Sequence, residues 1–226
     1  MTFGKKILSF FKILDLNIDL PYEVEVMNPF KEKSTFSICN QFYNKYYDDN
    51  NSRYLILGIN PGRFGGGITG IPFTDSIRLQ NICCIENEFQ KKQELSSVFI
   101  YELIKAFGDA EQFYSKFYIS SISPLGFTKN NKNLNYYDDR QLEIAIKPFV
   151  IDCLKKQLKF GISTEVAFCL GEGKNFLYLS KLNNEMKFFN KIISLPHPRF
   201  IMQYKLKRKE EYIDRYLREL NVIELL

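Results

Sequence analysis

Four short apolar segments, rich in β-branched and aliphatic residues, predict the strands of a buried sheet. Each is bounded by turn-forming residues, and together they cover residues 54–59, 117–122, 165–170 and 191–195. Segments with the apolar periodicity of a helix lie between or after them, at residues 95–107, 139–159, 173–183 and 204–220. Strands that alternate with helices are typical of a parallel sheet covered on both faces, so the pattern predicts an α/β fold.

Polar residues follow three of these strands at the point where each strand ends. Asn60 follows the first, Ser121 and Ser123 lie at the end of the second, and His197 follows the last. Because the carboxyl ends of parallel strands meet at one edge of a sheet, where ligands bind in such folds, we expect these side chains to converge on a single cleft.

The run of residues 58–73, Gly-Ile-Asn-Pro-Gly-Arg-Phe-Gly-Gly-Gly-Ile-Thr-Gly-Ile-Pro-Phe, predicts a ligand-binding loop after the first strand. Its six glycines and two prolines can continue neither a strand nor a regular helix. Glycines let backbone groups approach a ligand closely and Phe73 supplies a flat surface, so the loop suits a planar heterocycle. A purely connecting loop is the alternative reading.

Two nucleotide-binding motifs are excluded for this loop. Gly65, Gly67 and Gly70 have the GxGxxG spacing, but a dinucleotide fingerprint requires its first glycine directly after the strand and its last at the start of a helix. Gly70 instead leads into Ile-Pro-Phe. No Gly-Lys-Ser/Thr ends the run, which excludes a Walker phosphate loop.

His197 is the only histidine of the chain, and it lies between Pro196 and Pro198. The two prolines fix the backbone, so we expect a stiff, exposed side chain with a functional role; an ordinary surface or core histidine is the alternative. Neither a second histidine nor a cysteine or carboxylate at ligand spacing accompanies it, which argues against a metal site.

Composition is that of an ordinary globular protein. The 226 residues hold no linker or repeat, so we expect one domain over residues 1–226, with residues 1–50 as a helical extension packed on it. Five cysteines without CxxC spacing fit neither a disulfide framework nor a zinc or iron–sulfur site, which predicts reduced thiols and a cytoplasmic location. Residues 1–14 lack the features of a signal peptide or membrane span.

Positive charge is concentrated near the carboxyl terminus. The net charge of +5 is mild, but residues 199–209 contain five cationic side chains and no acidic one. Such a run is compatible with a polyanionic partner, and a solvated helix face is the alternative.

Three segments together resemble one family. Residues 58–62 (Gly-Ile-Asn-Pro-Gly), 69–73 (Thr-Gly-Ile-Pro-Phe) and 197–199 (His-Pro-Arg) resemble motifs of the SMUG branch, the single-strand-selective monofunctional uracil-DNA glycosylases, of the uracil-DNA glycosylase superfamily. Residues 123–125 (Ser-Pro-Leu) and the closing helix support the match, which spans roughly residues 50–226.

The resemblance implies a three-layer α/β/α sandwich around a four-stranded parallel sheet, in agreement with the strand pattern. It implies a monofunctional DNA glycosylase of base excision repair, which hydrolyses the N-glycosidic bond of uracil or a related deaminated base. It implies no cofactor and no metal. It also implies single- or double-stranded DNA as the partner, with no membrane, and we expect a monomer.

The resemblance also implies a role for particular residues. Asn60 positions the hydrolytic water, and His197 stabilises negative charge on the leaving base. The pocket for the flipped base corresponds to Ile59, Gly62, Phe73 and Ser121. The contacts to DNA correspond to Arg199, Lys205, Lys207 and Arg208.

Two departures from the family pattern keep alternatives open. Ser121 stands where the family has a uracil-reading asparagine, and a hydroxyl cannot replace the paired donor and acceptor of an amide. Uracil, xanthine and hypoxanthine therefore all stay open as bases. The loop at Arg199 is shorter than the family's wedge, so Arg199 is either a wedge or a phosphate contact. The alternatives are a nucleic-acid-binding member of the fold with weak or lost catalysis, and a hydrolase of free nucleosides.

Overall fold

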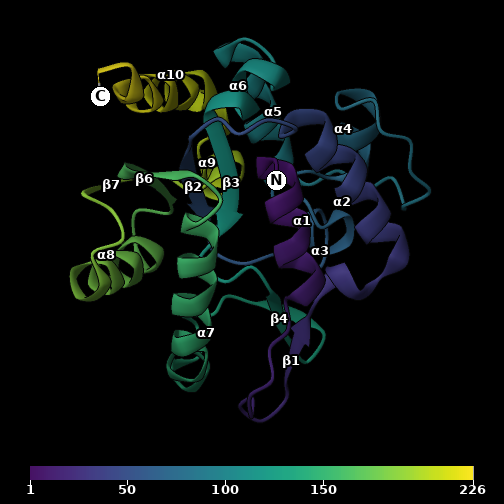
Figure 1. Ribbon diagram of the computed structural model, residues 1–226, viewed down its shortest axis with the longest axis vertical. Helices are drawn as coiled ribbons and strands as arrows, with labels where there is room; N and C mark the ends of the chain where they lie inside the picture. The colour runs from purple at the N-terminus through teal and green to yellow at the C-terminus, as the bar shows by residue number, and fades with distance from the viewer. Residues whose placement is uncertain (226) are drawn as a thin grey trace.

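A four-stranded parallel sheet forms the centre of the computed structural model, which describes residues 1–225 (Figure 1). The strand order is β3-β2-β6-β7, and every neighbouring pair is parallel. The strands are β2 (Arg53–Gly58), β3 (Phe117–Ser121), β6 (Ile162–Leu170) and β7 (Lys191–Leu195). The predicted α/β sandwich with a four-stranded parallel sheet is confirmed.

Helices cover both faces of this sheet. Helices α5 and α10 contact each other on one side, whereas α7 and α8 pack on β6 from the other (Figure 1). The helices are α1 (Phe3–Ile13), α2 (Lys33–Tyr46), α3 (Gly66–Thr69), α4 (Ser76–Asn81), α5 (Leu95–Phe107), α6 (Ala110–Lys116), α7 (Arg140–Leu158), α8 (Lys174–Met186), α9 (Pro198–Tyr204) and α10 (Lys209–Leu220). Short 3₁₀ turns are η1 (Pro29–Lys31), η2 (Leu206–Arg208) and η3 (Asn221–Leu225).

The helix predicted over residues 204–220 is confirmed for residues 209–220, which form α10, but its predicted start is wrong. A new helix, α9, begins directly after β7, because Pro198 has the backbone angle of a first helical residue and His197 caps it. This helix ends at Tyr204, since Lys205 leaves the helical region with φ −131° and ψ 19°. The turn η2 then reverses the chain into α10. Arg199 therefore lies on the first turn of a helix rather than in a loop.

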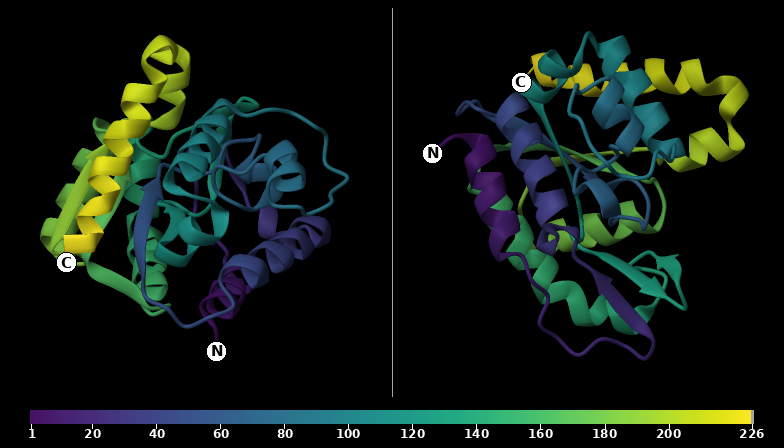
Figure 2. Two further views of the ribbon diagram at one scale, coloured as in Figure 1. Left: turned by 90° about the horizontal axis from the view of Figure 1, so that it is seen from above. Right: turned by 90° about the vertical axis from the view of Figure 1, so that its right-hand side faces the viewer.

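The amino-terminal fifty residues contribute a strand as well as helices. Helices α1 and α2 lie side by side (Figure 2). In the chain, β1 (Val24–Met27) comes between these two helices, and it pairs antiparallel with β4 (Gly126–Lys129). The third strand of this small sheet, β5 (Lys132–Leu134), pairs with β4 through a turn in which Asn130 and Asn131 have positive φ. Two such residues are typical of the tight type I′ hairpin turn. The small sheet lies apart from the central one (Figure 2).

Arg53 ties the amino-terminal helices to the central sheet. Its side chain is fully buried, and its guanidinium pairs with Asp49 at 2.7 Å and donates to the Tyr114 carbonyl at 2.7 Å. The rings of Phe3 and Tyr47 lie over it, with centroids 4.7 and 4.8 Å away. A buried cation is tolerated only with such complete pairing, so Arg53 fixes these segments against the start of β2.

Candidate active site

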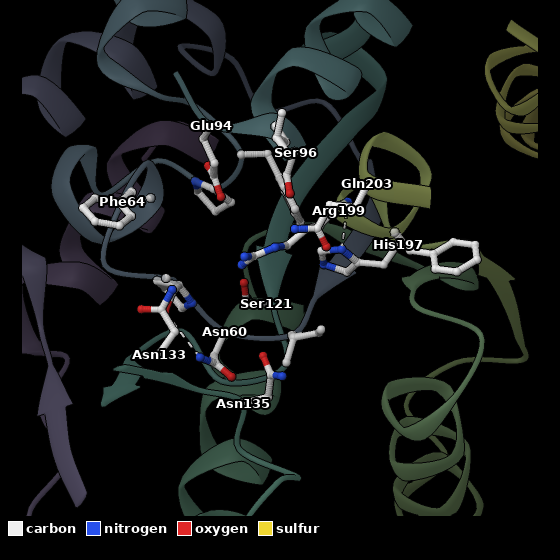
Figure 3. Close-up of a pocket in the computed structure, with 18 of the residues that line it drawn as sticks. Asn60, Phe64, Glu94, Ser96, Ser121, Asn133, Asn135, His197, Arg199 and Gln203 are labelled. Atoms are coloured by element: carbon white, nitrogen blue, oxygen red, sulfur yellow. Dashed lines mark hydrogen bonds between the residues drawn. The ribbon is translucent and has the colours of Figure 1, made fainter. Parts of the chain in front are cut away.

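A cavity of about 570 Å³ opens at the carboxyl edge of the central sheet. Residues far apart in the chain line it, including seven of the predicted site residues: Ile59, Asn60, Gly62, Phe73, Ser121, His197 and Arg199. Figure 3 shows polar side chains pointing into the cavity from the loop after β2, from the end of β3, from α9 and from the small sheet. The predicted convergence on one cleft is thus present, except that Ser123 does not line it: its hydroxyl is buried and donates to the Leu125 carbonyl at 2.8 Å.

The β4–β5 hairpin holds the side chain of Asn60. The Asn60 Oδ1 atom accepts from the Tyr136 N–H at 3.1 Å, and Nδ2 donates to the carbonyls of Leu134 and Pro61 at 3.2 and 3.3 Å. Both donor hydrogens are thereby engaged. An amide oxygen can accept two hydrogen bonds, so one acceptor position on Oδ1 is left for a group in the cavity, such as a water molecule.

Phe73 forms one wall of the cavity in a conformation that is unusual for its residue type. Its φ is 52°, in the left-handed region that non-glycine residues seldom adopt. The ring lies against the end of β2, where a Cβ on Gly58 would come within 3.0 Å of two ring atoms. Such strain is typical of functional sites. Gly58 thus allows the ring of Phe73 to approach the strand end.

Ser121 ends β3 beside Gly58, with which it pairs in register. Its side chain is almost fully buried, and within residues 1–225 its hydroxyl makes no hydrogen bond to another residue. The hydroxyl therefore stays available to donate to a ligand or to accept from one.

His197 faces the cavity as a neutral imidazole. Its Nδ1 atom accepts from the Arg199 N–H at 3.2 Å (Figure 3), which leaves the proton on Nε2. Burial and the nearby charge of Arg199 lower the pKa of His197 to about 4. The side chain is half-buried rather than exposed as the sequence suggested. At neutral pH, His197 is therefore a fixed N–H donor without positive charge.

The predicted basic residues divide into two groups. Arg199 lines the cavity, whereas Lys205, Lys207 and Arg208 follow α9 and are not among the lining residues. The Arg208 guanidinium pairs with the Glu211 carboxylate at 2.6 Å on the protein surface. Arg208 is thus the one of these three side chains that already has an acidic partner among the described residues.

Aromatic side chains form two rims of the cavity that the sequence did not reveal. On one rim Phe64 is 37% exposed, and the Lys92 ammonium lies 3.5 Å from its ring centroid. On the other, the rings of Phe200 and Tyr204 pack at 5.6 Å and are 44% and 71% exposed. Exposed rings beside cations are typical of surfaces that bind nucleic-acid bases and phosphates.

Glu94 is a further lining residue that the sequence did not reveal. Burial raises the pKa of its carboxyl to about 7, and the nearby Asp75 raises it further, whereas Ser97 and Arg199 act in the opposite direction. The carboxyl thus changes charge near neutral pH.

No group of three or more His, Cys, Asp or Glu side chains that could hold a metal ion occurs within residues 1–225. In that same part of the chain, no helix combines the length and the apolar character needed to cross a bilayer.

Comparison with known proteins assigns the family. The profile of the Uracil DNA glycosylase superfamily matches residues 44–221, more than half of the chain. The chain belongs to the uracil DNA glycosylase superfamily. It is also similar to the crystal structure of wild-type SMUG2 from Pedobacter heparinus, with 52% sequence identity over 100% of both chains and a TM-score of 0.97. Among curated proteins, no relative of the chain was found.

Membership of the uracil DNA glycosylase superfamily makes the chain a DNA glycosylase, a hydrolase of N-glycosidic bonds in DNA. The resemblance to the SMUG branch is confirmed at the level of the family. The amide of Asn60, the wall of Phe73 and the N–H of His197 surround one space in this glycosylase. That arrangement places a hydrogen-bond acceptor, a flat aromatic ring and an N–H donor around one space.

Proposed function

We propose that this glycosylase removes uracil or a related deaminated base from DNA by a monofunctional mechanism. The observation that carries the proposal is the convergence of Asn60, Phe73 and His197 on one cavity. A base inside a duplex cannot reach such a cavity, so the target nucleotide flips out of the stack, and stacking on Phe73 offsets part of the cost.

His197 stabilises the leaving base in this proposal. Cleavage of the N-glycosidic bond leaves negative charge on the base, and a preorganised N–H beside that charge is worth about 10²–10³ in rate. Because the pKa of His197 is about 4, the donor is the neutral imidazole. The hydrogen bond from the Arg199 N–H to Nδ1 supports this role, because it leaves the proton on Nε2, which is free to donate to another group.

Asn60 positions the attacking water. An amide cannot take a proton from water, so Asn60 acts by orientation, and the remaining acceptor position on Oδ1 supports that role. The hairpin that holds the amide limits its rotation, as water positioning requires.

Ser121 reads the base edge, together with the pocket backbone at Ile59 and Gly62. One hydroxyl donates or accepts but does not impose the paired pattern of an amide, so we expect several deaminated bases as substrates.

The DNA around the flipped nucleotide contacts a different set of side chains. Its phosphates are held by Arg199, Lys205, Lys207 and Arg208. The exposed rings of Phe200 and Tyr204 stack against the bases next to the flipped nucleotide.

A panel of oligonucleotides carrying uracil, xanthine or hypoxanthine, single- and double-stranded, tests the proposal. We expect cleavage after alkali treatment with at least one base, and its strong reduction in Asn60→Ala and His197→Ala. The exposed Asn184→Ala is the matched control. Absence of base release from every oligonucleotide would refute the proposal, and strand cleavage without alkali would refute the monofunctional mechanism.

A DNA-binding protein with lost catalysis is the second candidate, and Ser121 in place of the family's asparagine favours it. Tight binding of uracil-containing DNA without base release supports that candidate. A hydrolase of free nucleosides would act on deoxyuridine and would be insensitive to charge reversal at Lys207. Both DNA-directed hypotheses predict that this reversal weakens function.

A further inference from the structure

The backbone on both sides of Asn135 holds the amide of Asn60. The Asn60 Nδ2 atom donates to the Leu134 carbonyl at 3.2 Å, and Oδ1 accepts from the Tyr136 N–H at 3.1 Å. The amide thus pairs with the edge of the chain at residues 134–136 in the way that a neighbouring strand does. Asn135 is therefore the residue beside which the Asn60 amide lies, and its half-buried side chain lines the same cavity.

The amide of Asn135 has a fixed orientation. Its Nδ2 atom donates to Asp138 Oδ2 at 2.7 Å, and the other oxygen of Asp138 pairs with the Lys174 ammonium at 3.3 Å. Because a carboxylate oxygen accepts hydrogen bonds and does not donate them, Nδ2 of Asn135 faces Asp138 and Oδ1 faces away from it. Figure 3 shows the side chains of Asn60 and Asn135 next to each other below Ser121, with their amide oxygens on the facing sides.

Both amide oxygens can accept further hydrogen bonds. Within residues 1–225, Oδ1 of Asn135 accepts none from another residue, and Oδ1 of Asn60 accepts one. Two acceptors that face each other need a donor with two hydrogens between them, and a water molecule is such a donor. The space between the two amides therefore suits one water molecule.

We propose that Asn135 is a second acceptor for the attacking water. The proposal rests on the proposed function, in which Asn60 is the first acceptor. A water molecule on one acceptor can turn about that hydrogen bond, whereas a water molecule that donates both hydrogens has one orientation and keeps a lone pair for the sugar. Orientation of this kind lowers the barrier of the chemical step without a contribution to DNA binding.

The step balances without a base on the protein. The water oxygen forms a bond to C1′ of the sugar while the N-glycosidic bond breaks, and the electron pair of that bond leaves with the base. The added water then loses one proton to the departing base or to solvent. Neither Asn60 nor Asn135 takes this proton, since a neutral amide is not a base at ordinary pH.

Single-turnover base release and DNA binding, measured for two variants of Asn135, test the proposal. Asn135→Ala should lower the rate by about 10- to 100-fold and change Kd by less than about twofold. Asn135→Asp keeps an acceptor but loses the hydrogen bond to Asp138, so it should be at least about threefold faster than Asn135→Ala. The exposed Asn184→Ala is the matched control and should keep the wild-type rate. If Asn135 only stabilised the turn, Asn135→Asp would be as slow as Asn135→Ala, and that result would overturn the proposal.

A comparison of bases separates water positioning from base recognition. The attacking water is common to all substrates, so Asn135→Ala should slow the release of every base that the wild type removes by the same factor. A loss confined to one base would overturn the proposal, because it would assign Asn135 to the base edge. In an Asn60→Ala background, Asn135→Ala should cost much less than it does alone, since both residues act on one water molecule. Full additivity of the two losses would contradict that.

A crystal structure of the unbound wild type gives a readout that needs no activity. We expect a water molecule within about 3.2 Å of Oδ1 of both Asn60 and Asn135, and its absence would overturn the proposal. Base release by the wild type is measured separately. Its absence from every oligonucleotide refutes the proposed function, whereas normal base release by Asn135→Ala refutes the role of Asn135 alone.

Discussion

Replacing His197 by asparagine or glutamine separates its two contributions. Asparagine retains an acceptor for the Arg199 N–H, as the Nδ1 atom does now at 3.2 Å, but its amide is too short to reach the position of Nε2. Glutamine places its amide near that position and loses the short capping geometry. One variant therefore keeps the helix cap and the other keeps the donor.

Loss of the donor and loss of the cap affect different quantities, the reaction rate and the free energy of unfolding. Loss of a single preorganised donor costs about 10²–10³ in rate, or about 3–4 kcal/mol of transition-state stabilisation. Loss of the cap costs about 1 kcal/mol of the free energy of unfolding. We therefore expect His197→Asn to be nearly as stable as the wild type. Its rate should be about 10²- to 10³-fold lower, as the loss of one donor predicts. His197→Gln should retain more activity and unfold more easily.

Single-turnover excision of uracil from a labelled oligonucleotide, followed by alkali and gel electrophoresis, measures the rate. Urea denaturation measures the stability. Activity should also be independent of pH between about 5.5 and 8 as far as His197 is concerned, since its pKa is about 4. A His197→Asn rate within threefold of the wild type would refute the reasoning. A rate that falls as pH rises through about 6.5, with this fall absent in the variant, would show that the imidazolium acts instead.

Three further predictions follow from the geometry. Asn60→Ala should lower the single-turnover rate by about 100-fold with Kd changed less than about twofold, because orientation of water and not binding is lost; Asn60→Asp, which keeps the acceptor, should retain more activity. Tyr204→Ala should weaken excision from double-stranded DNA more than from single-stranded DNA, since its exposed ring is placed to support the opened stack; an equal effect on both substrates would argue against that role. Arg53→Met should lower the free energy of unfolding by about 3–5 kcal/mol in urea denaturation, because it leaves Asp49 and the Tyr114 carbonyl without their donor; exposed Arg140→Met is the control and should change it by less than about 0.5 kcal/mol.

The central sheet was predictable because its strands are continuous apolar runs with breakers at both ends. The convergence of Asn60, Ser121 and His197 followed from the rule that parallel strands end on one edge. The strands follow from the local sequence, and the convergence follows from the alternation of strands and helices. Both patterns are visible in a single sequence.

The small sheet was not predictable from the apolar pattern. Its strands β4 and β5 are short and mixed in polarity, and β1 pairs with a segment about a hundred residues away. One signal was available: Asn130 and Asn131 form the tight turn between β4 and β5, and two adjacent asparagines favour such a turn.

Glu94 had no sequence signal at all. It follows a polar stretch without periodicity, and its burial results from the way the glycine loop and α9 meet around it. The break after Tyr204 was missed because the apolar periodicity continues across it, and only the cap at His197 marks the separate helix.

The bond between Asn60 and the β4–β5 hairpin has a consequence for how much of the chain the site depends on. The hairpin belongs to a sheet whose other outer strand, β1, lies in the first fifty residues, before the family profile begins at residue 44. The residues that bond to the Asn60 amide, Leu134 and Tyr136, lie within the matched range, whereas the strand that pairs along the other side of β4 lies outside it. A fragment limited to residues 44–221 would therefore keep the partners of Asn60 but lose one edge of the small sheet that carries them.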